Sequence, residues 1–171
     1  SINDFILKAT ALTLKVHPRL NAALIDNAVH QYSSINLGVA IDIEAGLVVP
    51  VLRDAEKLSL TQIAAEVRVL ADKARTSSLE PADFQNGTFT VSNLGGLGVD
   101  WFTPVLNPPQ AAILGVGRIR SAPVVTGGEV EVGQMATLVV TFDHRVIDGA
   151  PCARFLTDLK ALIESPEALT T

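Results

Sequence analysis

Residues 142–149 (FDHRVIDG) place a histidine directly after an apolar stretch of the chain. His144 could act as a general base, because the unperturbed pKa of an imidazole is about 6.5 and the ring can take and return a proton near neutral pH. Four ionisable side chains lie within six positions here, and such clusters need partners and tend to occur at functional sites. The pattern alone leaves His144 open equally to a catalytic role and to that of a satisfied histidine at a strand end.

Asp148 and Ser92 are the other two residues that could take part in such chemistry. Asp148 precedes a glycine and an expected helix, so it could cap this helix or shape the turn that holds His144 through an ion pair. These roles are compatible, and neither makes Asp148 a proton carrier. Ser92 ends a strand-like stretch that breaks into glycines. It could be an ordinary turn serine or a hydroxyl donor to a developing oxyanion.

Other candidate motifs are weaker. Residues 95–98 (GGLG) lack the lysine and the spacing of phosphate-binding loops, so we expect a flexible or close-packed turn. Cys152 is the single cysteine, which excludes an internal disulfide, and its place in an expected helix favours a buried thiol over a nucleophile. His17 and His30 have no acidic constellation around them, so we expect them to be structural or solvated. No further ligand stands out to complete a metal site with His144.

The elements that must position these residues follow from hydrophobic spacing, turn residues and caps. We expect helices over residues 2–16, 60–74 and 150–164, a short helical turn over 80–84, and strands over 36–43, 47–52, 88–92, 111–119, 124–132 (a hairpin through two glycines) and 136–142. Strands dominate the middle of the chain and long helices lie at its ends. This order predicts an α+β fold, a two-layer sandwich with helices on one face of a mixed β-sheet.

Composition limits the classes of protein to which the chain can belong. Its 171 residues suffice for one domain, and 48% are hydrophobic, so either the core is large or part of the surface is buried against other subunits. A formal net charge of −5 argues against a nucleic-acid partner. No apolar stretch reaches the roughly 20 residues of a membrane helix, which argues against a membrane partner.

Taken together, these residues resemble the catalytic domain of the dihydrolipoyl acyltransferases of 2-oxo acid dehydrogenase complexes. Residues 142–149 match the Asp-His-Arg-x-x-Asp-Gly signature of that family. The other matching stretches agree in order and are NDFI at 3–6, HP at 17–18, NA at 21–22, GLVVPV at 46–51, GTFTVSNLG at 87–95 and NPPQAAILGVG at 107–117. The resemblance covers essentially the whole chain, whereas the His-x-x-x-Asp-Gly core alone also occurs in chloramphenicol acetyltransferase and other acyltransferases.

This resemblance implies a fold like that of chloramphenicol acetyltransferase and a homotrimer with active sites at its subunit interfaces. The implied reaction transfers an acyl group from dihydrolipoamide to the substrate coenzyme A, without a metal. His144 of one subunit would be the general base, Ser92 of the next would stabilise the oxyanion, and Asp148 would position the histidine. Asn93 and Leu94 would line the channel for coenzyme A or the lipoyl group. The loops look most like those of acetyl-transferring members, as in pyruvate dehydrogenase.

The resemblance also implies a larger assembly. Residues 1–171 correspond to the catalytic domain without its N-terminal segment, which could hold an arginine partner of Asp148, and no lipoyl or peripheral-subunit-binding domain is recognised. The lipoyl group would come from another domain, so the partners would be lipoyl domains and other subunits of the complex. The homotrimer could build a cubic or dodecahedral core, although residues 166–171 are less apolar than the leucine-rich tails that link trimers in this family. The expected location is the bacterial cytoplasm or the mitochondrial matrix.

Two alternative functions remain open. A non-catalytic core scaffold, such as a dihydrolipoamide dehydrogenase-binding protein, would share the fold but tends to lose the histidine, whereas His144, Asp148 and Ser92 are all present. A stand-alone acyltransferase with an amine or hydroxyl acceptor would share the His-x-x-x-Asp-Gly core but not the other matching stretches.

Overall fold

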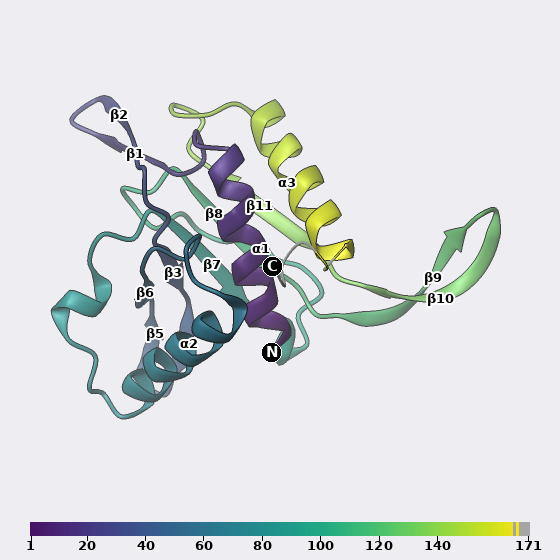
Figure 1. The fold of residues 1–171 in the computed structure, drawn as a ribbon, viewed down its shortest axis with the longest axis horizontal. Coiled ribbons are helices and arrows are strands. Elements are labelled where there is room, and N and C mark those ends of the chain that lie inside the picture. Colours follow the sequence, from purple (N-terminus) through teal and green to yellow (C-terminus); the bar gives the residue numbers. More distant parts are fainter. Residues whose placement is uncertain (166, 168–171) are drawn as a thin grey trace.

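Three α-helices lie side by side over one face of a β-sheet in the computed structural model, which describes residues 1–165 and 167 (Figure 1). They are α1 (Ile2–Val16), α2 (Leu60–Arg75) and α3 (Gly149–Glu164). Ser1 with Asp4 and Ser59 with Gln62 form capping boxes that satisfy the first free amides of α1 and α2. The helices expected from hydrophobic spacing are therefore confirmed. Residues 166–171, whose apolar content was compared with family tails, lie outside the described residues except for residue 167.

The main sheet has five strands in the order β11-β8-β7-β3-β6. They are β3 (Leu37–Val39), β6 (Val51–Leu52), β7 (Phe89–Asn93), β8 (Ala112–Val116) and β11 (Leu138–Phe142). The three central strands are parallel, and the two edge strands are antiparallel to their neighbours. This is the mixed sheet of the predicted α+β sandwich.

The hydrophobic core fills the space between the helices and this sheet. Its largest fully buried side chains come from both layers and include Leu7, Leu14, Ile63, Phe89, Leu114, Phe155 and Leu159. Burial of an aliphatic or aromatic side chain of this size contributes about 1.5–3 kcal/mol. The two layers therefore hold each other, and the ends of the strands are fixed relative to the helices above them.

Three antiparallel ribbons extend from the main sheet. They are β1 (Ala22–Ile25) with β2 (Ala28–Gln31), β4 (Ile41–Ile43) with β5 (Gly46–Val48), and β9 (Arg120–Thr126) with β10 (Glu129–Met135). The strand expected over 36–43 is thus two strands in different sheets. The β1–β2 hairpin was not predicted, although Asp26 and Asn27 at its turn have the positive φ angles (50° and 60°) typical of two-residue hairpin loops.

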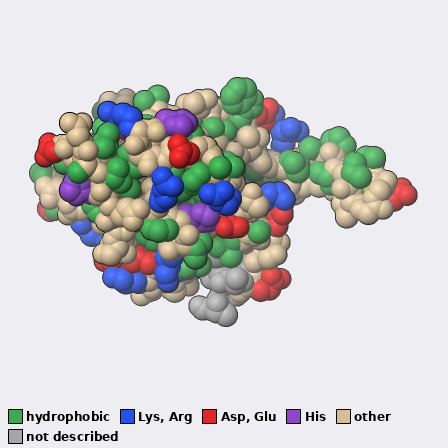
Figure 2. All heavy atoms as spheres, turned by 90° about the horizontal axis from the view of Figure 1, so that it is seen from above, with side chains coloured by type: hydrophobic (Ala, Val, Ile, Leu, Met, Phe, Trp, Pro, Cys, Tyr) green, Lys and Arg blue, Asp and Glu red, His purple; other side chains and the backbone are tan. Residues whose placement is uncertain are grey.

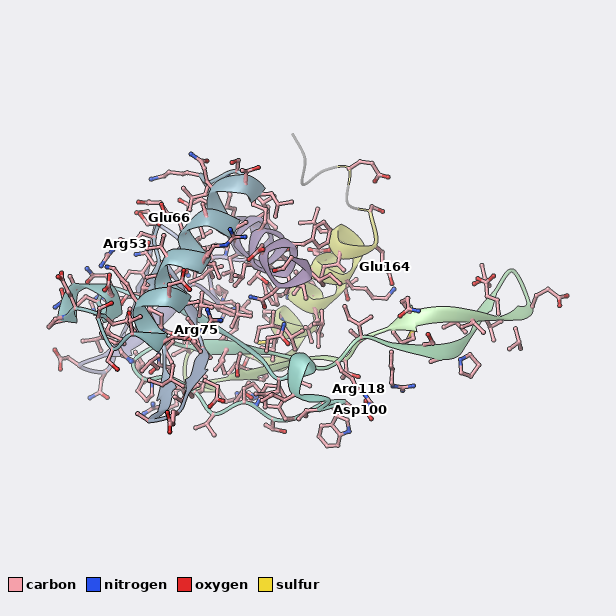
Figure 3. All side chains as sticks on the ribbon, turned by 90° about the horizontal axis from the view of Figure 1, so that it is seen from below. Arg53, Glu66, Arg75, Asp100, Arg118 and Glu164 are labelled. Atoms are coloured by element: carbon pink, nitrogen blue, oxygen red, sulfur yellow. The ribbon has the colours of Figure 1, made fainter. Side chains whose placement is uncertain are left out.

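The β9–β10 ribbon forms an arm that projects away from the rest of the molecule (Figures 1 and 3). Val125, Val130 and Val132 on this arm are 72–79% exposed. Apolar side chains gathered on an exposed ribbon are typical of surfaces that contact another protein. Within the described residues, no helix has the length and hydropathy needed to cross a membrane.

Candidate active site

His144 stands at the apex of a tight turn between β11 and α3. The amides of Val146 and Ile147 donate hydrogen bonds of 2.9 and 3.1 Å to the carbonyl oxygen of Asp143, which closes the turn. The side chains of Val146 and Ile147 are buried below it and anchor it in the protein interior. The His144 side chain is instead 73% exposed. The turn thus presents one imidazole on a firmly held backbone.

Two charged neighbours of His144, Asp143 and Arg145, form an ion pair with each other, whereas Asp148 faces the imidazole. Arg145 donates three hydrogen bonds of 2.7–3.2 Å from its guanidinium to Asp143, and this contact lowers the pKa of the Asp143 carboxyl. Asp148 Oδ1 lies 3.7 Å from His144 Nδ1, at ion-pair distance. His144 Nε2 is then the ring nitrogen that can face a substrate. Figure 2 shows histidine, lysine and arginine side chains on one face of the molecule.

Asp148 also occupies the N-cap position of α3, as one of its two expected roles requires. However, its side chain makes no capping hydrogen bond, although its backbone has the extended conformation of a cap residue. The carboxylate therefore remains available to the imidazole, which favours its role in holding His144.

Cys152 lies one helical turn beyond Asp148, on the inner side of α3. Its side chain is 3% exposed, and burial raises the pKa of the thiol to about 11. A thiol with this pKa is almost wholly protonated at neutral pH and is a poor nucleophile. The structure thus confirms the expected buried thiol.

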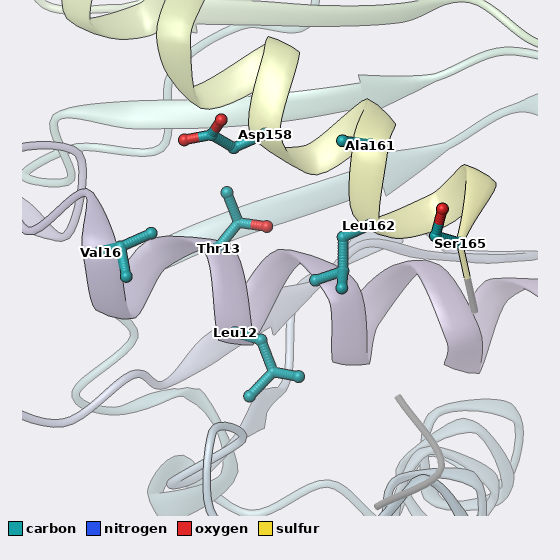
Figure 4. A pocket seen from close by; sticks show the side chains of 7 residues that line it. All are labelled: Leu12, Thr13, Val16, Asp158, Ala161, Leu162 and Ser165. Carbon is teal, nitrogen blue, oxygen red and sulfur yellow. The ribbon is translucent and has the colours of Figure 1, made fainter. Parts of the chain in front are cut away.

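His17 has an acidic neighbour, contrary to the expectation from the sequence. Its Nε2 atom lies 2.7 Å from Oδ2 of Asp158, and its ring packs edge-on against Phe155 at 5.8 Å between centroids. Figure 4 shows Asp158 extending from α3 toward α1 across a groove of about 430 Å³, whose other lining residues are mostly apolar. This His–Asp pair ties the end of α1 to α3. His30, by contrast, is exposed on β2, as expected.

Ser92 lies near the end of β7, where side chains alternate between the two faces of the sheet. Phe89 and Val91 point into the core beneath the helices, whereas Thr90 points to the other face and donates a 2.6 Å hydrogen bond to Gln110. Ser92 therefore lies on the face opposite the helices. Its half-buried hydroxyl forms no hydrogen bond with any residue that the structure describes.

Asn93 and Leu94, the expected channel residues, follow Ser92 directly. Asn93 points to the helix side, where its Nδ2 donates to Oδ1 of Asn3 on α1 and its Oδ1 accepts from the amide of Gly95, both at 2.9 Å. Leu94 is half-buried and its amide donates to the carbonyl of Val116. The structure thus places Asn93 and Ser92 on opposite faces. The sequence did not indicate that Asn3 belongs to the site, because its contact with Asn93 joins residues 90 positions apart.

The turn after Ser92 is close-packed at Gly95, whereas Gly96 and Gly98 have open space around them. A Cβ atom on Gly95 would lie 2.7 Å from the carbonyl oxygen of Gly117, and one on Gly117 would lie 1.9 Å from that of Asp100. Both distances are too short, so only glycine fits at these positions. Asp100 and Arg118, which pair at the base of the arm, hold the two segments together (Figure 3).

His144 and Ser92 lie at opposite ends of the sheet in one chain. Ser92 pairs with Gly115, which pairs with Val139 two strands away. The two strand spacings amount to about 10 Å, and Phe142, where β11 ends, is about 10 Å further along the strand direction. His144 follows two residues later. One chain therefore cannot bring both side chains to a single reacting carbon.

The family model and the relatives of this chain point to the same protein family. The model of the 2-oxoacid dehydrogenases acyltransferase (catalytic domain) family matches residues 1–171. A mitochondrial protein of Arabidopsis thaliana, the dihydrolipoyllysine-residue acetyltransferase component 2 of the pyruvate dehydrogenase complex, is 45% identical over 99% of this chain. The chain spans only about a third of that relative, 32% of its length.

Solved structures give the same result for the fold. The cubic core of the pyruvate dehydrogenase multienzyme complex and the Azotobacter vinelandii dihydrolipoamide acetyltransferase each match with a TM-score of 0.95 and 38% identity, over 100% of this chain and 71% of theirs. Chloramphenicol acetyltransferase matches with a TM-score of 0.60 at 18% identity, covering 95% of this chain and 78% of its own, which shows a shared fold.

The Azotobacter work concerns the role of a serine, a histidine and an asparagine in the catalytic mechanism of that enzyme. In that enzyme the serine precedes the histidine by 52 positions, and the asparagine follows it by 4. Ser92, His144 and Asp148 have the same spacing here, with an aspartate in the place of the asparagine.

Proposed function

The chain belongs to the 2-oxoacid dehydrogenase acyltransferase family, and from this premise we propose that it transfers an acyl group, acetyl in the first instance, between dihydrolipoamide and coenzyme A. One observation carries most of the weight: His144 is exposed on a buried turn, with a carboxylate on its Nδ1 side and no described residue bonded to Nε2. The shared spacing with the Azotobacter serine, histidine and asparagine supports the same three positions. A non-catalytic scaffold is not favoured, because this chain retains all three polar side chains.

His144 and Ser92 act at two points of the reaction. A thiol with a pKa of roughly 8.5 is mostly protonated at neutral pH, so His144 Nε2 takes the proton of the attacking thiol as its sulfur bonds to the thioester carbon. The carbonyl oxygen becomes an oxyanion, which the Ser92 hydroxyl stabilises by donating a hydrogen bond. The bond from carbon to the leaving sulfur then breaks, and His144 returns its proton to that sulfur. Asp148 stabilises the imidazolium through its carboxylate.

Such a site needs two copies of the chain, because His144 and Ser92 of one copy lie at opposite ends of the sheet. A cyclic trimer with head-to-tail interfaces would join His144 of each subunit to Ser92 of the next. The exposed valines of the β9–β10 arm support contact with a second copy. The cubic core among the structural relatives supports further assembly of such trimers. We propose lipoyl domains and other subunits of a 2-oxo acid dehydrogenase complex as partners, and the bacterial cytoplasm or mitochondrial matrix as the location.

Mixing two inactive variants tests the shared site. We expect chains with His144→Ala and chains with Ser92→Ala to be nearly inactive alone. Equal co-expression should restore about a quarter of the wild-type acetyl-transfer rate, because one interface in four then joins an intact histidine to an intact serine. Mixing each variant with itself is the control. An inactive mixed assembly would place both residues in the site of one chain and overturn the proposed interface.

A further inference from the structure

Asn3 and Asn93 form a hydrogen-bonded relay on the helix side of the sheet, directly behind Ser92. Asn3 lies in the first turn of α1, and its Oδ1 accepts from Asn93 Nδ2 at 2.9 Å. The Oδ1 atom of Asn93 in turn accepts from the amide of Gly95 at 2.9 Å. From this geometry we propose that Asn3 is a positioning residue for the Ser92 hydroxyl. The inference rests on the proposed function, in which Ser92 is the oxyanion donor.

The relay acts through the strand itself. Although adjacent side chains of a strand point to opposite faces, Asn93 and Ser92 share one peptide unit, and the contact of Asn93 with Asn3 restrains that unit in addition to the pairing of β7 with β8. Ser92 makes no side-chain hydrogen bond within the described part of the chain, so no polar contact on its own face sets its direction. In the proposed relay, the restraint on Ser92 beyond its strand pairing comes from the helix side, where Asn3 holds Asn93.

The surroundings of the relay give the loop room to move if the bond to Asn3 is lost. A cavity of about 290 Å³ borders the two asparagines, Gly95 and Gly96. Gly96 has open space around it, and glycine has no Cβ atom to restrict its backbone, so the turn can relax there once the bond to Asn3 is lost. Backbone bonds from Leu94 to Val116 and from Arg118 to Val99 remain in place without Asn3. Loss of the relay should therefore misplace Ser92 without unfolding the strand.

Two substitutions of Asn3 separate the relay from general stability. Asn3→Ala removes the acceptor, whereas Asn3→Asp keeps an oxygen acceptor at the same position. We expect Asn3→Ala to lower kcat for acetyl transfer about 10-fold, because small misplacements of a reacting group are costly, and to change the KM values for dihydrolipoamide and acetyl-coenzyme A by less than about twofold. Asn3→Asp should restore kcat to within about twofold of wild type.

The decisive measurement repeats Asn3→Ala in a Ser92→Ala background. If Asn3 acts through Ser92, the second substitution lowers kcat no further once the hydroxyl is absent. Ser59→Ala, which removes the cap of α2, is the control: it should lower the melting temperature and leave kcat unchanged. Because Asn3 is half-exposed, we expect both of its variants to fold.

Each contrary outcome identifies what has failed. Equal losses from Asn3→Ala in both backgrounds, or an Asn3→Asp variant as slow as Asn3→Ala, would overturn the relay and leave the proposed function intact. A wild-type kcat in Ser92→Ala alone would overturn the oxyanion role of Ser92, and the relay with it.

Discussion

The two ends of the β-sheet position their polar side chains in different ways. The turn that carries His144 is closed within one short segment by the bonds of the Val146 and Ile147 amides to Asp143, although Val146 is buried against residues from other segments. Ser92 is held by parts of the chain that are distant in sequence, because its neighbour Asn93 contacts the first turn of α1. The base is therefore positioned by local turn chemistry and the oxyanion donor by tertiary contacts. Substitutions far from the site should disturb the Ser92 end more than the His144 end.

Replacing His144 should have the largest effect. We expect His144→Ala to lower the rate of acetyl transfer between dihydrolipoamide and coenzyme A by about 100- to 10,000-fold, because a positioned general base contributes that much. The melting temperature should hardly change, since the side chain is 73% exposed and the turn closes through its backbone. A large drop in melting temperature would show that this end is not the self-contained unit described above. Turnover near that of wild type would exclude His144 as the base.

Replacing Ser92 should have a smaller effect on the same assay. We expect Ser92→Ala to slow turnover by about 100- to 1,000-fold, the usual loss of one oxyanion donor. The pH dependence of the remaining activity should keep its shape, because His144 is untouched. The exposed Ser33, replaced by alanine, provides a matched control that should retain full activity. An unchanged rate in the Ser92 variant would show that Ser92 takes no part in the reaction.

The smallest expected effect is on the labelling rate of the Cys152 thiol. This rate measures how firmly the His144 end of the sheet is held. The thiol is buried in the first turns of α3, and its pKa is raised to about 11. At pH 8 we expect iodoacetamide to label the folded protein on the order of 100-fold more slowly than the guanidinium-unfolded chain, since the thiolate is the reactive form. Mass spectrometry at timed intervals measures both rates. Comparable rates would mean that α3 opens beside Asp148, and that the turn is not firmly held.

The same difference explains what could be predicted from the sequence. The helices and their caps depend on residues three or four positions apart, and the His144 turn lies within eight consecutive residues. The helices and the turn that holds His144 were predicted. The β1–β2 hairpin had a local signal in Asp26 and Asn27 that was missed.

Long-range contacts could not be predicted in the same way. The strand order places β7 between β3 and β8, which no local pattern encodes. The pairs Asn3–Asn93 and His17–Asp158 join residues 90 and 141 positions apart, so neither appears in any local window of the sequence. The place of Ser92 near the end of a strand was predicted, but the bond between its neighbour Asn93 and Asn3 was not.

The β9–β10 arm has a consequence for how the stability of this protein should be understood. Its two strands pair only with each other among the described residues, and an isolated two-stranded ribbon is marginally stable in water. In the proposed trimer, much of the free energy that orders the arm would come from association. Mass action then makes the order of the arm depend on the concentration of the chain, so that folding and assembly share one equilibrium.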